Sequence, residues 1–176
     1  MAAITSRPAT GQPILVQRFD VQSSTAKQSV GTEILCTDGC VFVYGLVGEA
    51  ITGQSYVCVQ NSTTGQWYME TTTLAATRPA VVGISAYNGA TTNAYYQWFC
   101  VKKPGNASPG LGVRTDSNVA VSVGLCCGST AGQQLATTAT TESRKTGLRL
   151  LTATPTTAAA ANTSFEMDRP KYISLT

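Results

Sequence analysis

The sequence predicts an all-β protein, an antiparallel β-sandwich or barrel with an extended N-terminal arm. Runs of strand length that are rich in Val, Tyr, Phe, Trp and Thr recur at short intervals from residue 33 onward, and such runs favour β-strands. Gly, Pro or Asn stands between successive runs, as turns require. No window carries the apolar period of an amphipathic helix. Many short strands without helices are typical of a sandwich or barrel.

Eight runs are expected to form strands. They are residues 40–47 (CVFVYGLV), 53–60 (GQSYVCVQ), 66–73 (QWYMETTT), 80–87 (AVVGISAY), 94–101 (AYYQWFCV), 118–125 (NVAVSVGL), 148–154 (LRLLTAT) and 172–175 (YISL). The pairs Asp38-Gly39 and Asn88-Gly89 are turn signals that favour hairpins. These signals place most of the predicted sheet within residues 31–176.

The most aromatic run, residues 94–101, alternates its side chains between two faces of the predicted strand. One face carries Tyr96, Trp98 and Cys100, and the opposite face carries Tyr95, Gln97 and Phe99. We interpret the first face as core packing and the second as a contact between subunits.

Residues 1–30 differ from the rest of the chain, and we assign them to an N-terminal arm that precedes a domain of residues 31–176. Prolines and small polar residues surround one isolated apolar stretch, residues 14–21 (ILVQRFDV). A segment with so few apolar residues cannot build its own core. The residues predicted to bind a partner are Ile14, Leu15, Val16 and Phe19, because a purely flexible tail has no use for them. An edge strand of the main domain is the alternative.

Composition argues against an enzyme. The chain has no histidine and nine carboxylate residues in all, which removes the side chain most used in acid–base catalysis near neutral pH. Glu166 and Asp168 are the closest carboxylates, but Arg169 and Lys171 beside them favour a solvated charged turn. We therefore predict no catalytic residues and no cofactor.

The six cysteines are expected to be buried thiols. They are Cys36, Cys40, Cys58, Cys100, Cys126 and Cys127. No N-terminal run is long enough to be a signal peptide, so we expect a soluble protein made in the cytosol, where thiols stay reduced. The Cys36–Cys40 spacing resembles half of a zinc site, but the adjacent pair Cys126-Cys127 would point to opposite faces of a strand. No metal site is predicted.

Charge and hydropathy also limit the partners. The net charge is +3, and the basic residues are scattered, whereas nucleic-acid binders cluster them on one stripe. The longest apolar run is too short to span a bilayer. Charged residues form 12% of the chain, about half the usual share. We therefore expect neither nucleic acid nor membrane as a partner. We expect instead a surface that packs against other proteins.

Residues 40–151 resemble the small β-rich decoration, or cement, proteins of tailed-bacteriophage heads. The stretches that carry the resemblance are YVCVQNSTTGQWYMETT, RPAVVGISAYNGATTNAYYQWFCVKKPG and VAVSVGLCCGSTAG, followed by TGLRLLTAT. The resemblance implies an all-β virion protein that is made in the host cytoplasm and binds the outer capsid surface. It also implies a homo-oligomer, with a trimer favoured, that clamps neighbouring subunits of the major capsid protein.

Two other functions remain open at this point. One is another virion component, such as a tail or fibre-base protein, which copy number in particles would distinguish. The other is a carbohydrate-binding β-sandwich used in host adsorption, for which Trp67 and Trp98 are the stacking candidates. Full burial of both tryptophans would argue against carbohydrate binding.

Overall fold

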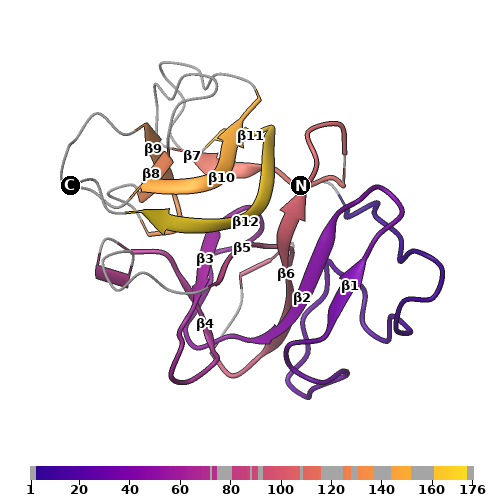
Figure 1. Ribbon diagram of the computed structural model, residues 1–176. Helices are drawn as coiled ribbons and strands as arrows, with labels where there is room; N and C mark the ends of the chain where they lie inside the picture. Colours follow the sequence, from indigo (N-terminus) through magenta and orange to yellow (C-terminus); the bar gives the residue numbers. More distant parts are fainter. Residues whose placement is uncertain are drawn as a thin grey trace.

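The computed structural model is nearly all β, as predicted (Figure 1). It describes residues 3–71, 73–74, 81–87, 89–90, 93–107, 109–115, 125–127, 131–136, 144–151 and 161–173. The strands are β1 (Glu33–Leu35), β2 (Val41–Leu46), β3 (Val57–Gln60), β4 (Trp67–Met69), β5 (Val81–Ser85), β6 (Tyr96–Lys103), β7 (Val113–Thr115), β8 (Leu125–Cys127), β9 (Gln134–Ala136), β10 (Arg144–Leu150), β11 (Ala161–Thr163) and β12 (Phe165–Ile173).

The first half of the chain forms a ring of strands. Antiparallel pairing runs through β2, β6, β5, β3 and β4. The ring closes where Val47, just after β2, forms a parallel bridge with Trp67 of β4. Gly48 N donates to Trp67 O at 2.8 Å, and the Glu49 carboxylate accepts from Met69 N at 2.6 Å. The outer edge of β4 is therefore paired within the chain.

The second half forms a further ring. Pairing runs from β7 through β9, β8 and β10 to β12. Only Ser164 separates β12 from β11, and β11 pairs with β7, so the path returns to its start. The two rings join where β12 pairs with β6, through Met167 with Lys103 and Asp168 with Lys102. This arrangement is consistent with the predicted sandwich or barrel class.

The turn predicted at Asp38-Gly39 forms the β1–β2 hairpin. Cys36 N donates to Cys40 O at 2.8 Å, and Gly39 N donates to Cys36 O at 3.0 Å. Gly39 has φ +80°, a conformation that glycine adopts without steric cost. The other hairpin signal joins β5 to β6, which pair antiparallel, although Asn88 lies outside the described residues.

Strands β2, β5 and β6 of the first ring bury both of their faces. Trp98 and Cys100 of β6 belong to a core cluster that extends to Phe165 in the second half. Phe99 belongs to a second cluster with Trp67, and its ring stacks on that of Trp67 at 4.1 Å between centroids. The face of Gln97 and Phe99 was predicted to contact another subunit. Both residues are fully buried inside the chain itself, because the ring of strands closes over them.

Trp67 lies across the inside of the first ring. A Cβ atom added to Gly83 of β5 would stand 2.9 Å from Trp67 Cζ3, and one added to Gly45 of β2 would overlap its pyrrole edge. Because β4, β5 and β2 lie on different sides of the ring, these contacts show that the indole fills its centre. The two glycines leave the space that the indole occupies.

Candidate partner-binding surface

The apolar stretch near the N-terminus lies along the first ring as an extended segment. Gln17 and Phe19 face inward and are buried, with 4% and 3% of their surfaces exposed. Ile14 and Val16 face outward, with 84% and 62% exposed. Leu15 is half-buried and packs against the first core cluster. The side chains of this segment therefore alternate in direction. Gln17 and Phe19 point inward, whereas Ile14 and Val16 point outward.

Phe19 fixes this segment to the core. Its ring stacks on Phe42 of β2 at 4.2 Å between centroids, with 20° between the ring planes. It also meets the ring of Trp98 edge to face at 5.3 Å. Such pairs stabilise beyond the area that they bury, so Phe19 is a core residue of the chain.

Both the nitrogen and the oxygen of the Gln17 side-chain amide form hydrogen bonds. Its amide nitrogen donates to Val21 O at 2.7 Å and to Tyr96 O at 3.2 Å. Its amide oxygen accepts from the Tyr44 hydroxyl at 2.8 Å, and that hydroxyl accepts from Lys27 N at 3.1 Å. A buried amide with satisfied donors and acceptor fixes one geometry for the residues around it.

Main-chain bonds hold the rest of the N-terminal segment. They include Ala9 N to Leu35 O (2.9 Å), Thr37 N to Arg7 O (2.9 Å), Ser23 N to Tyr96 O (3.0 Å), Tyr96 N to Ser23 O (2.8 Å) and Gly31 N to Tyr44 O (2.8 Å). Residues 7–9 thereby cover the outer edge of β1. The described residues before position 31 lie on the chain's own domain in Figure 1.

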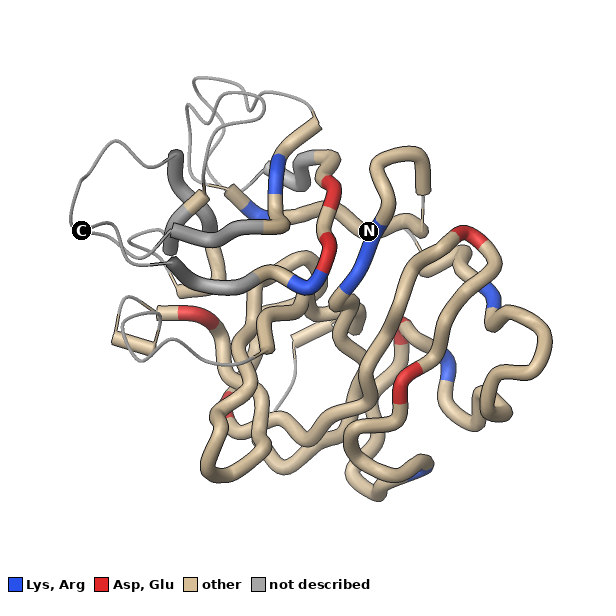
Figure 2. Tube along the Cα trace, in the orientation of Figure 1, with Lys and Arg blue, Asp and Glu red and all other residues tan. Residues whose placement is uncertain are grey.

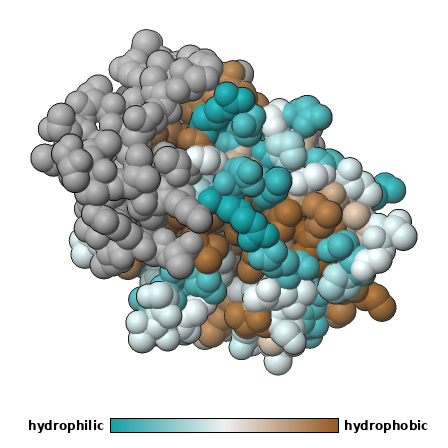
Figure 3. Space-filling model, in the orientation of Figure 1, coloured by the Kyte–Doolittle hydropathy of each residue, from teal (hydrophilic) through white to brown (hydrophobic). Residues whose placement is uncertain are grey.

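Exposed apolar side chains are concentrated near this segment. In the part of the chain that the structure describes, the large hydrophobic residues that are exposed all lie between positions 14 and 35. They are Ile14, Val16, Val21, Val30 and Leu35, and we call them the apolar surface. Figure 3 shows brown, apolar atoms over β1 and beside it. Single exposed hydrophobics are common, whereas a contiguous group of them is typical of interaction sites.

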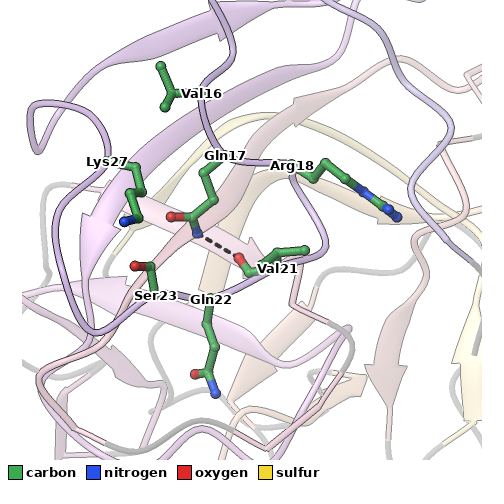
Figure 4. Close-up of a pocket in the computed structure, with 7 residues that line it drawn as sticks. All are labelled: Val16, Gln17, Arg18, Val21, Gln22, Ser23 and Lys27. Atoms are coloured by element: carbon green, nitrogen blue, oxygen red, sulfur yellow. Dashed lines mark hydrogen bonds between the residues drawn. The ribbon is translucent and has the colours of Figure 1, made fainter.

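A shallow pocket of about 330 Å³ opens within this segment, and seven residues between positions 16 and 27 line it (Figure 4). Val16 and Val21 are part of its lining. Figure 4 shows the Gln17 amide directed at the Val21 carbonyl, while Arg18 points away from it. The Arg18 guanidinium pairs with Asp20 at 2.8 Å. The two valines make part of the lining apolar, and the exposed Lys27 adds a positive charge to it.

The structure places the four predicted partner-binding residues in three different settings. Ile14 and Val16 are open to solvent, Leu15 is half-buried, and Phe19 is buried in the chain's own core. The sequence did not single out Val21, Val30 and Leu35.

The alternative sites are explained by packing or ion pairs. Trp67 and Trp98 are fully buried, which argues against their use as sugar-stacking platforms. Glu166 and Asp168 lie on strand β12 and not in the predicted turn, because Glu166 pairs with Arg149 of β10 and Asp168 pairs with Lys102 of β6. They face Arg149 at 2.9 Å and Lys102 at 3.5 Å, and Figure 2 shows charged residues gathered along β6, β10 and β12.

Four of the six thiols are described, and all four are free and buried. They are Cys36, Cys40, Cys58 and Cys100; the side chains of Cys126 and Cys127 lie outside the description. The described residues contain no group of three or more His, Cys, Asp or Glu that could hold a metal ion. They also contain no helix that is long and apolar enough to cross a membrane.

Comparisons with known proteins add no relative. No protein-family model, no curated protein and no solved structure matches the chain.

Proposed function

We propose that this chain is a structural virion protein, without enzymatic activity, that binds the outer surface of a bacteriophage capsid. It would stabilise the capsid by clamping neighbouring subunits of the major capsid protein, as a homo-oligomer in which a trimer is favoured. The observation that carries the proposal is the outward placement of Ile14 and Val16 on a segment whose inward residues are fixed in the core.

A fixed apolar surface is suited to binding protein. Because Gln17 and Phe19 already hold the segment in place, little conformational entropy is lost when a partner covers Ile14 and Val16. Burial of apolar side chains gives about 25 cal/mol per Å² of surface removed from water. Several copies joined in one oligomer multiply a modest affinity at each site.

Because the N-terminal segment is anchored in the core, point substitutions test the proposal better than a deletion does. Deletion of residues 1–22 would remove Phe19 from the core, so a loss of binding would have no clear meaning. We instead replace Ile14 and Val16 together by Asp, with Thr63→Asp as the control, since Thr63 is exposed on the β3–β4 turn. Both variants should keep wild-type stability, because the altered side chains are exposed.

The readout is occupancy on purified capsids that have been stripped of this protein. The Ile14/Val16 variant should lose at least about tenfold in affinity, a free-energy change of roughly 1.4 kcal/mol, while the Thr63 variant should bind as wild type. Equal binding by all three proteins would exclude the apolar surface as the contact. A copy number of only a few per particle would favour the tail or fibre-base alternative instead.

A further inference from the structure

Three buried thiols meet where the β1–β2 turn lies against β6. Cys36 is 2% exposed, and Cys40 and Cys100 are fully buried. All three belong to the same core cluster. Cys58, the other described thiol, belongs to the separate cluster inside the first ring. It donates a weak hydrogen bond to Tyr56 O at 3.6 Å.

The strand register brings two of these thiols together. Val41 of β2 pairs with Lys102 of β6, but Phe42 pairs with Cys100, so a bulge interrupts the register between the two pairs. Side chains alternate along a strand, which puts Cys40 on the same face as Phe42 and therefore beside Cys100. The Cys100 thiol itself donates to Lys102 O at 3.2 Å, and Cys40 lies near enough to raise the pKa of Cys100.

The surroundings keep these thiols protonated in the folded protein. Burial raises the pKa of Cys100 well above its ordinary value, and the neighbouring Cys40 raises it further. Burial also raises the pKa of Cys36 to about 12. Lys103 lies close enough to lower the pKa of Cys100, but this effect is smaller than that of burial. Since the thiolate is the reactive form, oxidation requires an opening of the turn.

The N-terminal segment controls that opening. Pro8 forms a bridge with Cys36, and the Ser6 hydroxyl donates to the Asp38 carboxylate at 2.7 Å. The same carboxylate accepts from Cys40 N at 3.1 Å. Residues 6–8 therefore close the turn that carries two of the three thiols.

We propose that Cys40 and Cys100 are a redox pair, which forms an intramolecular disulfide when the β1–β2 turn opens in the presence of a small disulfide oxidant. The thiolate of one cysteine attacks a sulfur of the oxidant and releases one reduced thiol. The second cysteine, as thiolate, then attacks the mixed disulfide and releases the other. The two cysteines lose two protons and two electrons, and the oxidant is reduced to two thiols. This inference is independent of the proposed function.

The test uses the folded, full-length protein incubated with oxidised glutathione at mildly alkaline pH. Peptide mass spectrometry after alkylation of free thiols should identify a Cys40–Cys100 linkage, and the intact protein should be lighter by two hydrogens. The bridge joins residues distant in sequence, so the unfolding midpoint should rise. Ser6→Ala, which loosens the turn, should speed the reaction.

Two controls separate this pair from the other thiols. Cys58→Ala and Cys36→Ser should each still form the bridge, whereas Cys40→Ser and Cys100→Ser should not. A linkage of Cys36 to Cys40, or a folded wild-type protein that forms no linkage while the urea-unfolded chain does, would overturn the proposal. The disulfide mapping of the wild-type protein is sufficient to decide between these outcomes. The test therefore remains valid even if one of the cysteine variants does not fold.

Discussion

The indole N–H of Trp98 donates to the main-chain oxygen of Gln17 at 2.9 Å. This bond joins the centre of β6 to the N-terminal segment, 81 positions away in the sequence. It lies beside the contact of the same indole with the Phe19 ring. Gln17 and Phe19 are therefore packed against the folded core, while the side chains of Ile14 and Val16 face solvent.

Replacing Phe19 by Ala should destabilise the protein by ~3–5 kcal/mol, the usual cost of removing a buried aromatic side chain. The ring loses its stacking on Phe42 and its edge contact with Trp98. Denaturant unfolding measures the change, with Ile14→Ala as the exposed control that should cost under ~0.5 kcal/mol. A Phe19 variant as stable as this control would mean that the segment does not share the core in solution.

Replacing Gln17 by Ala should cost ~1–3 kcal/mol, because the buried Tyr44 hydroxyl is left without its acceptor. Tyr44→Phe removes the same bond from the other side. In a double-mutant cycle the second change should cost less once the first has been made. Strictly additive losses in the unfolding free energy would argue against this bond.

Replacing Gly83 by Ala should cost ~1–3 kcal/mol through overpacking. The new methyl group would stand 2.9 Å from Trp67 Cζ3 and 3.2 Å from Cys100 O. In a Trp67→Phe background the penalty should shrink, since phenylalanine lacks the outer atoms of the indole. An equal penalty in both backgrounds, measured by chemical unfolding, would place the indole elsewhere.

The Glu33–Arg169 ion pair should make stability depend on pH in the acidic range. The two guanidinium bonds to Glu33, at 3.0 and 2.6 Å, lower the pKa of this carboxyl. A lowered folded-state pKa contributes stability above the unfolded value of about 4.3. This contribution is lost as the pH falls through the folded value.

Because the Glu33 and Arg169 side chains are 47% and 52% exposed, solvent screening limits this contribution to under ~1 kcal/mol. The free energies of unfolding of wild type and Glu33→Gln should therefore differ slightly at pH 7. They should converge as the pH falls from about 4.3 through the lower folded-state pKa of Glu33. A difference that grows on acidification would contradict the assigned direction.

Strands with strong local patterns could be predicted from the sequence. Residues 40–47, 80–87 and 94–101 carry dense β-branched and aromatic residues, and they form β2, β5 and β6. Strands β1, β7, β9 and β11 were missed, because each is a three-residue piece that depends on distant pairing partners. Strand β12 overlaps the expected run 172–175 only at its last two residues. Most of the expected strand at residues 118–125 lies outside the described residues.

The candidate surface was only partly predictable. The apolar stretch ILVQRFDV was visible, but its inward and outward sides depend on distant residues. The Trp98 ring packs against Phe19, and the Tyr44 hydroxyl donates to Gln17. Sequence alternation separates positions 17 and 19 from positions 14 and 16. It does not say which set is buried, and hydrophobicity alone favours the wrong choice at Gln17.

The closed pairing of the strands affects how copies of this chain meet at high local concentration. Unpaired strand edges are templates on which identical chains add to one another and grow into fibrils. Here the first ring returns to β2, the second returns to β7, and residues 7–9 cover the outer side of β1. Among the described strands, high local concentration therefore favours contacts between side chains over open-ended growth of a shared sheet.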